Sequence, residues 1–326
     1  MSAELGIELW VKRDDLTGFA LGGNKGRKLE YLIAAALDSG AEAVVSCGST
    51  QSNFVRQLGG ACARFGLKCG AAVMDKPYDG PAGKPPDLHL PNEGGNLLAD
   101  EILGVDVRRF PDGTWEELYD HAESVALAYE AQGLRVYRIP IGGSSPLGAY
   151  GFYKAAEELD AQTEPFDQIV VSSSSGSTHS GLTYGYHGRP TRVIGISADP
   201  EPGLTEEFSE LCAGLDTLIG QNRQVRPEDF DLRLDWVGLG YAVPSEEGNA
   251  AIVRMARSEG IFLDPVYSGK AFAGLIDLAA RGELPGRTLF WHTGGSPSLF
   301  AVRRLAELST GLGQVVATQA AVHQAR

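Results

Sequence analysis

The feature that most constrains the fold of this chain is the alternation of short apolar runs with longer stretches of helical periodicity. Runs typical of buried strands occupy residues 7–12, 42–47, 68–74, 134–139, 166–172, 192–197 and 287–292. Helical patterns occupy residues 25–37, 51–66, 97–104, 115–132, 146–160, 203–219, 246–258, 269–282 and 297–309. This alternation predicts an α/β fold with largely parallel sheets. Between strand 68–74 and helix 97–104, the Pro- and Gly-rich residues 75–96 predict a loop or lid.

Length and charge narrow the class of protein further. A chain of 326 residues corresponds to about two domains, and with 43% hydrophobic residues it can bury a core of its own. The formal net charge of −14 repels nucleic acid and anionic membrane surfaces, so we expect neither as a partner. No apolar run is long enough to predict a membrane span. The charges among residues 1–15 and the four cysteines without metal-ligand spacing predict a cytoplasmic protein with reduced thiols.

Several common binding and catalytic fingerprints are absent from the sequence. No GxGxxG segment follows a predicted strand, and Leu182 and Thr183 stand where a P-loop has Lys and Ser or Thr. The six histidines are scattered, and neither HExxH nor GxSxG occurs. We therefore expect no dinucleotide site and no metal site.

The first segment that stands out is the run of small residues from Ser172 to Thr178, between a predicted strand and a predicted helix. Small residues let backbone N–H groups converge, and a helix N-terminus adds positive potential, so the segment is suited to cradle a phosphate. The alternative is a serine-rich turn that only caps the helix. Because no P-loop lysine follows, a phosphate here would be a monophosphate held mainly by backbone groups.

The second segment is the glycine-rich start of a helix that carries Lys25 and Lys28, three residues apart on one face. One amine could bond covalently and the other could meet an anion, since a partly desolvated lysine forms Schiff bases with carbonyls. The alternative is an ordinary basic first turn, although cations are disfavoured at a helix N-terminus. The third segment, Gly48–Phe54, opens a helix after a buried strand and suits a carboxylate, or serves as a cap.

Six segments, in this order, resemble a single family. They read LWVKRDDLTG, GGNKGRKLEYL, STQSNFVRQL, SGSTHSGL, LDPVYSGKAFAGL and HTGG. The resemblance is to the 1-aminocyclopropane-1-carboxylate deaminase / D-cysteine desulfhydrase family of pyridoxal-5′-phosphate (PLP) enzymes, in particular its D-cysteine desulfhydrase branch. It implies the tryptophan-synthase β-like fold, PLP fold type II, with two open, twisted, mainly parallel sheets and flanking helices. It also implies a large domain of residues 1–28 and 142–326, a small domain of residues 29–141, and a homodimer.

The resemblance implies roles for individual cofactor-binding residues. Lys25 would bond covalently to PLP, and Lys28 would approach the phosphate of the cofactor. Asn53 would hydrogen-bond the phenolic oxygen of PLP, and Thr293 would meet its pyridine nitrogen. The phosphate would be cradled by Ser175, Gly176, Ser177 and Thr178.

The resemblance also implies which residues meet the substrate, a small amino acid. Ser52, with Asn53 and the neighbouring backbone, would bind the substrate carboxylate, and the Ser52 hydroxyl would handle a substrate proton. Tyr241 and Tyr267 would face the substrate from the other side as catalytic residues. The substrate pocket would also include Phe54, at a position that is often polar in the family, and Ser268.

Two positions divide the family. Aminocyclopropane-carboxylate deaminases carry Glu where this chain has Ser268, and Leu where it has Thr293. A glutamate keeps the ring nitrogen protonated, which makes the strong electron sink that opening a cyclopropane requires, whereas hydroxyl partners suffice when a good leaving group departs from Cβ. We therefore expect a PLP-dependent lyase that acts on D-cysteine by β-elimination. The alternatives are an aminocyclopropane-carboxylate deaminase, an L-cysteate sulfo-lyase, a β-replacement synthase and a non-catalytic PLP-binding protein.

Overall fold

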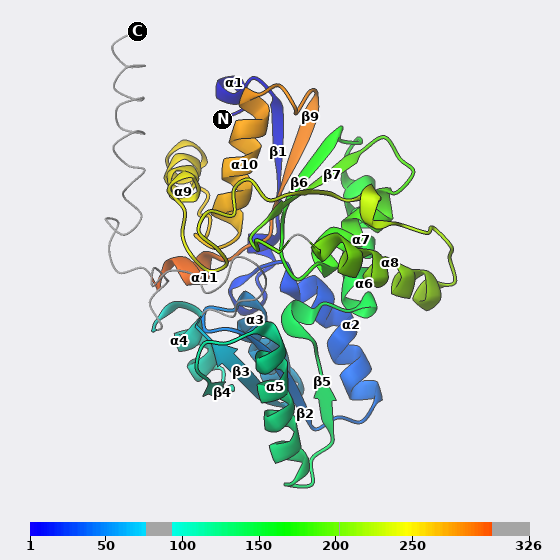
Figure 1. The fold of residues 1–326 in the computed structure, drawn as a ribbon, viewed down its shortest axis with the longest axis vertical. Coiled ribbons are helices and arrows are strands. Elements are labelled where there is room, and N and C mark those ends of the chain that lie inside the picture. Colours follow the sequence, from blue (N-terminus) through cyan, green and yellow to red (C-terminus); the bar gives the residue numbers. More distant parts are fainter. Residues whose placement is uncertain (76–92, 202, 302–326) are drawn as a thin grey trace.

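Two parallel β-sheets flanked by helices make up residues 1–75, 93–201 and 203–301, the part of the chain that the computed structural model describes (Figure 1). The five-stranded sheet has the order β1-β9-β6-β7-β8, and the four-stranded sheet has the order β4-β3-β2-β5. Each pairing between the described strands is parallel. The predicted α/β fold with two mainly parallel sheets is thereby confirmed.

Strands and helices alternate along most of the described chain. The strands are β1 (Glu8–Arg13), β2 (Ala43–Ser49), β3 (Lys68–Met74), β4 (Asp106–Arg109), β5 (Val136–Arg138), β6 (Gln168–Ser173), β7 (Arg192–Ser197), β8 (Asp231–Arg233) and β9 (Arg287–His292). The helices are α1 (Ser2–Leu5), α2 (Lys25–Asp38), α3 (Asn53–Phe65), α4 (Gly95–Ile102), α5 (Trp115–Glu130), α6 (Pro146–Gln162), α7 (Ser177–Tyr186), α8 (Leu204–Ile219), α9 (Glu246–Glu259), α10 (Ser268–Ala280) and α11 (Ser296–Leu299). No helix among them is both long and apolar enough to cross a bilayer.

The elements follow the predicted order, with small shifts at their ends. Strands β3, β7 and β9 have the predicted bounds, whereas α4 begins at Gly95, before the predicted start at residue 97. The sequence pattern does not predict β4 and β8, because both are short edge strands rich in Asp and Arg. Residues 76–92, most of the predicted loop or lid, lie outside the described residues, as does most of the helix predicted over 297–309.

The large sheet is buried on both faces, which explains why its central strands read as continuous apolar runs. Val170 of β6 and Phe290 of β9 pack on the face that α9 and α10 cover. Their sequence neighbours Ile169 and Leu289 point to the opposite face, where α6 and α7 lie. In the small sheet, Val44 of β2 faces α2 and α3, while the residues on either side of it in sequence face α5.

The carboxyl ends of strands from both sheets lead into the same region. In the large sheet, β6 is bonded to β7 on one side and to β9, which comes last in sequence, on the other. Such a switch in strand order leaves a crevice beyond the carboxyl end of the strand, where ligands of open α/β sheets bind. The strands of the small sheet fall within residues 43–138. The domain boundaries at residues 28–29 and 141–142 stay a prediction.

Candidate active site

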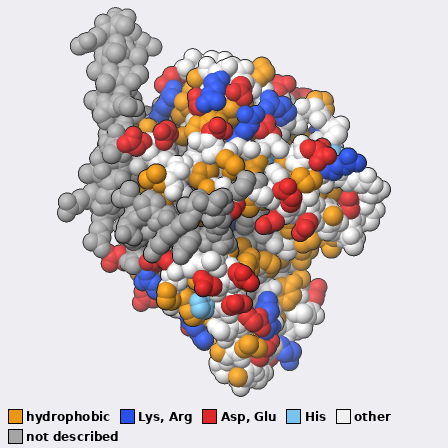
Figure 2. Space-filling model, viewed as in Figure 1, with side chains coloured by type: hydrophobic (Ala, Val, Ile, Leu, Met, Phe, Trp, Pro, Cys, Tyr) orange, Lys and Arg blue, Asp and Glu red, His pale blue; other side chains and the backbone are white. Residues whose placement is uncertain are grey.

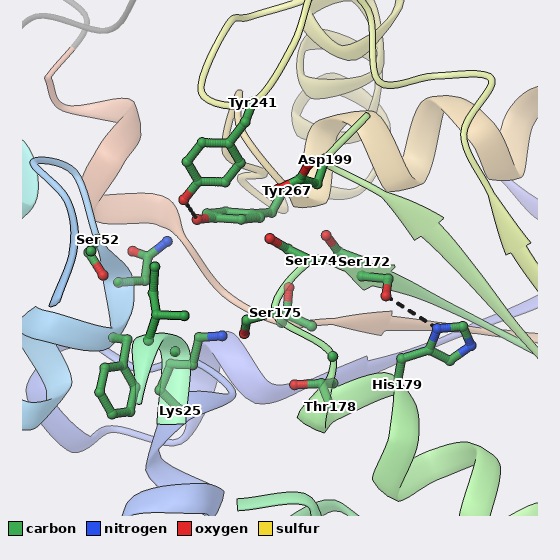
Figure 3. Close-up of a pocket in the computed structure, with 18 of the residues that line it drawn as sticks. Lys25, Ser52, Ser172, Ser174, Ser175, Thr178, His179, Asp199, Tyr241 and Tyr267 are labelled. Carbon is green, nitrogen blue, oxygen red and sulfur yellow. Dashed lines mark hydrogen bonds between the residues drawn. The ribbon is translucent and has the colours of Figure 1, made fainter. Parts of the chain in front are cut away.

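A cavity of about 340 Å³ lies between the two sheets, a volume in the range of small-molecule sites. Lys25 projects into it from the start of α2, opposite Tyr241 and Tyr267, with Ser52 on one side and the serine-rich loop on the other (Figure 3). The predicted site residues that line it are Lys25, Lys28, Ser52, Asn53, Phe54, Ser175, Gly176, Thr178, Tyr241, Tyr267 and Thr293. Two predicted site residues, Ser177 and Ser268, are not in its lining.

Two lysine side chains meet at the base of the cavity. Lys28 is 1% exposed, and its Nζ donates to the carbonyl oxygen of Gly142 at 3.1 Å. A Cβ atom at Gly142 would lie 2.4 Å from Ser175 Oγ and 3.8 Å from Lys25 Nζ. The backbone at Gly142 therefore brings both amines and the serine-rich loop together, and only glycine leaves room for that approach.

Burial makes the two amines less basic than ordinary lysines. Desolvation lowers the pKa of Lys25 from 10.5 to about 8. The pKa of Lys28 lies well below its ordinary value because of burial and the neighbouring charge of Lys25. Within the described residues neither amine has an ion-paired carboxylate. The pair is thus suited to an anionic ligand, and Lys25 can reach the neutral, nucleophilic state near physiological pH.

The serine-rich loop and the N-terminus of α7 form a second wall of the cavity. Ser174, Ser175 and Gly176 follow β6 directly, and α7 starts at the next residue (Figure 3). Gly176 has φ +96°, a backbone conformation that favours glycine. Ser177 turns away from the cavity, since its N–H donates to Ser144 Oγ at 3.2 Å and its hydroxyl donates to the carbonyl of Gly143.

The N-terminus of α3 faces the cavity from the small sheet. Ser52 caps the helix, because its Oγ accepts the backbone N–H of Val55 at 3.3 Å, which leaves its own hydroxyl proton free to donate. Asn53 Oδ1 accepts bonds from Asn96 Nδ2 at 3.1 Å and from Arg56 at 3.4 Å. The amide nitrogen of Asn53 is then the group left to donate to a ligand. A carboxylate at this helix end would meet both backbone and side-chain donors.

A pair of tyrosines closes the side opposite Lys25. The hydroxyls of Tyr241 and Tyr267 are hydrogen-bonded to each other (Figure 3). Burial raises the pKa of both phenols, so both keep their protons at neutral pH. The ring of Trp115, which also lines the cavity, meets Tyr241 edge to face at a centroid distance of 5.3 Å. This wall can present a proton donor to a ligand.

Ser268 lies behind the cavity wall rather than in it. Its hydroxyl donates to Asp264 Oδ2 at 2.6 Å, and Asp264 also accepts the backbone N–H groups of Val266, Tyr267 and Ser268. The Ser268 proton is thus committed to Asp264. Thr293, by contrast, lines the cavity and is the hydroxyl available at this end.

Several cavity residues were missed by sequence reasoning. Asn24 donates to Thr178 Oγ1 at 3.0 Å, and its place directly before Lys25 was a usable signal. Asp264 stands in the DPVYSG segment and could have been found with it. Trp115, Tyr119 and Asp199 also line the cavity, but no local pattern distinguishes them from structural residues.

His179 supports the serine-rich loop from behind. Its ring is fully buried, and Nδ1 is 3.2 Å from the hydroxyl oxygen of Ser173. Burial lowers the pKa of His179 to about 4, so the ring is neutral at physiological pH. A neutral ring adds no charge to the cavity.

This donor set fits PLP. The cofactor requires a nucleophilic lysine for its aldehyde, a nest of N–H and hydroxyl donors for its phosphate, and a donor for its phenolic oxygen. Lys25, the start of α7 and the Asn53 amide provide these three features around a single cavity. Fold and site together define a PLP-dependent enzyme of the α/β type.

Comparison with known proteins identifies the family. Residues 1–294 match the family described as "Pyridoxal-phosphate dependent enzyme", and the chain belongs to that family. It is 41% identical over 313 residues to a D-cysteine desulfhydrase of Yersinia enterocolitica, an alignment that covers 92% of this chain and 90% of the relative. It is 39% identical over 310 residues to a D-cysteine desulfhydrase of Salmonella paratyphi B, with the same coverage of 92% and 90%. The resemblance stated from the sequence motifs is confirmed.

Solved structures agree with the fold. A crystal structure of an ACC (1-aminocyclopropane-1-carboxylate) deaminase homologue matches with a TM-score of 0.84 and 36% identity, covering 94% of this chain and 90% of the other. Threonine deaminase isoform 2 of Solanum lycopersicum matches with a TM-score of 0.61 at 16% identity, over 95% of this chain and 80% of the other. The second match shows a shared fold alone.

Proposed function

We propose that this chain is a D-cysteine desulfhydrase, a PLP-dependent lyase that converts D-cysteine to pyruvate, sulfide and ammonia. The observation that carries the proposal is the placement of the Lys25 amine between the N-termini of α3 and α7, with a tyrosine pair opposite. Similarity to D-cysteine desulfhydrases over 92% of the chain supports this substrate. The roles of the individual side chains are part of the proposal.

The cofactor-binding residues would hold PLP in three places. Lys25 carries the covalent bond, Lys28 and the start of α7 receive the phosphate, and Asn53 donates to the phenolic oxygen. When bound, PLP supplies an electron sink that stabilises negative charge at the substrate Cα. Thr293, rather than Ser268, faces the ring nitrogen in this proposal, because the Ser268 hydroxyl is bonded to Asp264.

In this proposal, α3 orients the substrate, and a base removes its Cα proton. The Ser52 hydroxyl and the N-terminal amides of α3 bind the carboxylate. The Lys25 amine, whose pKa of about 8 allows it to take and release a proton near neutral pH, or the Ser52 hydroxyl removes the Cα proton. Tyr241 and Tyr267 face the Cβ substituent and can protonate the departing sulfur.

The reaction balances without a redox partner. The electrons of the broken Cα–H bond form a Cα=Cβ double bond, and the Cβ–S pair leaves with the sulfur as sulfide. The enamine that is released takes up one water and yields pyruvate and ammonia. No second, nucleophilic substrate is needed, which distinguishes this reaction from β-replacement.

Replacement of Lys25 tests the proposal. Lys25→Ala should lose the visible absorbance of covalently bound PLP and all release of keto acid, because the second amine in the described cavity, that of Lys28, is held by the carbonyl of Gly142. A chain with Lys25→Ala that still turns over D-cysteine at the wild-type rate would show that the central assignment is wrong. Trapping with borohydride, followed by mass spectrometry, places the PLP bond on Lys25 or elsewhere.

Aminocyclopropane-carboxylate deamination is the second candidate. It is favoured by the structural similarity to an ACC deaminase homologue at 36% identity. It is disfavoured by Ser268 and Thr293, which stand where the deaminases carry Glu and Leu, since ring opening requires a stronger electron sink than β-elimination of sulfide. An L-cysteate sulfo-lyase would differ in the leaving group, sulfite instead of sulfide, and in the configuration at Cα, and is separated by assay.

Cytoplasmic location and a homodimeric state belong to the same proposal. All four cysteines are free and buried, which suits a reducing compartment. The dimer follows from the family resemblance.

Acidic and basic side chains lie intermingled on the face drawn in Figure 2, and the net charge of −14 disfavours nucleic acid as a partner.

A further inference from the structure

Arg56, in the second turn of α3, is 0% exposed although it carries a guanidinium group. Its Nε donates to Asn96 Oδ1 at 2.7 Å, one Nη donates to the carbonyl of Ala20, and the other donates to the carbonyl of Gly22 at 3.2 Å. Burial lowers its pKa to about 10, and the nearby carboxyl of Asp100 opposes that shift. The arginine therefore keeps its charge at neutral pH. Its two Nη groups donate to the backbone of residues 20–22, the segment that leads to Lys25.

The next residue, Gln57, holds the same segment from the other side. Its Nε2 donates to the carbonyl of Phe19 at 3.1 Å, and its Oε1 accepts the backbone N–H of Gly26 at 3.0 Å. Gln57 is likewise 0% exposed. Two neighbouring side chains of α3 thus bond to backbone groups on both sides of Lys25.

The bonded segment has an unusual backbone. Ala20 has φ +44° and Leu21 has φ +66°, both in the left-handed region that residues other than glycine rarely adopt. Leu21 is 67% exposed, so packing of its side chain does not hold it there. Strained backbone of this kind persists only where surrounding contacts fix it, and the bonds from Arg56 to the carbonyls of Ala20 and Gly22 bracket the strained pair.

The same guanidinium reaches the other proposed PLP contact. Arg56 donates to Asn53 Oδ1 at 3.4 Å, and Asn96, which Arg56 also binds, donates to that oxygen at 3.1 Å. These bonds fix the orientation of the Asn53 amide. Arg56 thereby connects the backbone that precedes Lys25 to the end of α3 that faces the cavity.

We propose that Arg56 is a positioning residue for cofactor attachment, which holds residues 20–22 in their left-handed conformation and so places the Lys25 amine and the Asn53 amide together at one cavity. The proposal rests on the proposed role of Lys25 as the residue that bonds to PLP. It assigns no contact between Arg56 and substrate or cofactor. It predicts that loss of the several N–H donors of the Arg56 guanidinium misplaces Lys25 even when the positive charge is kept.

The first test compares Arg56→Lys with the wild-type chain. Lysine keeps the charge but cannot donate to three separate acceptors in a plane. We expect a dissociation constant for PLP about tenfold higher, and less PLP trapped on Lys25 by borohydride at subsaturating cofactor. The matched control is Arg223→Lys, since Arg223 also donates to backbone carbonyls, those of Tyr184 and Gly185, at the far end of α7. This control should bind PLP as the wild type does.

The second test separates positioning from a general loss of stability. Glycine adopts the left-handed conformation without the steric cost that leucine bears, so Leu21→Gly should favour the native loop when Arg56 is weakened. In the Arg56→Lys background, Leu21→Gly should restore PLP affinity by about fivefold. In the wild-type background, the same change should alter affinity by less than about twofold, because the loop is already fixed.

Two results would overturn the proposal. The first is that Arg56→Lys loads PLP on Lys25 with wild-type affinity. The second is that Leu21→Gly leaves the PLP-binding defect of Arg56→Lys unchanged while the thermal unfolding midpoints of the double and single variants match. The second result would show that Arg56 does not act through the left-handed segment. Failure of the proposed function looks different, because the wild-type chain itself would then carry no trapped PLP on Lys25.

Discussion

At the scale of single residues, burial determines the chemistry of the site. The two lysines lie where no described carboxylate offsets their charge, and the fold lowers the pKa of Lys25 to about 8. The same burial raises the pKa of the phenols opposite. An amine that can lose its proton therefore faces hydroxyls that keep theirs, which is the arrangement that proton removal at Cα and proton delivery to the sulfur leaving Cβ require.

The Lys25 pKa predicts a pH dependence of stability in the cofactor-free chain. Because the folded-state pKa of about 8 lies below the ordinary 10.5, the folded chain binds fewer protons than the unfolded chain between those values, and the Lys25 contribution to stability rises with pH across that window. Lys25→Met should be more stable than wild type near neutral pH, and its advantage should shrink by about 2 kcal/mol toward pH 10. Urea unfolding at both pH values measures this. A constant difference would contradict the lowered pKa.

At the scale of elements, the loop between β6 and α7 depends on one glycine. A Cβ at Gly176 would lie 2.4 Å from the ring of Phe208, and φ is +96°. Gly176→Ala should therefore displace the loop and weaken PLP binding at least about tenfold, or about 1.4 kcal/mol. Gly188, just beyond the other end of α7, has φ +75° and nothing within 4 Å of such a Cβ, so Gly188→Ala bears similar strain without a clash.

These two glycine variants should differ in cofactor binding rather than in stability alone. Fluorescence titration with PLP, alongside thermal unfolding, separates the two effects. If Gly188→Ala weakened PLP as much as Gly176→Ala does, the effect would come from helix α7 as a whole and not from the shape of the loop.

The sequence predicted the elements better where both sheet faces are covered. Strands β3, β7 and β9 have apolar runs that match their bounds, because each is buried on most of its length. The edge strands β4 and β8 carry Asp and Arg, since one side of each meets no further strand among the described residues, and their patterns resemble loops. The position of Ser268 could not be predicted either, because the competition of Asp264 for its hydroxyl is a contact within the folded chain.

At the scale of the whole molecule, the site exists only where segments from both sheets meet. The sequence motifs identify individual residues of the site. The hydrogen bonds from Arg56 and Gln57 to the backbone of residues 19–26, however, depend on how α3 packs against the start of α2. No local sequence pattern encodes that contact. Eleven of the predicted residues line one cavity, so the family motifs led to this candidate site, although they do not explain how its residues are held in place.

The central claim is that this site eliminates sulfide from D-cysteine. The most direct measurement is keto-acid release by the PLP-loaded chain, offered D-cysteine and 1-aminocyclopropane-1-carboxylate separately, with the products identified. We predict pyruvate and sulfide from D-cysteine and no product from the cyclopropane. Release of 2-oxobutyrate from the cyclopropane, or no pyruvate from D-cysteine, would contradict this account.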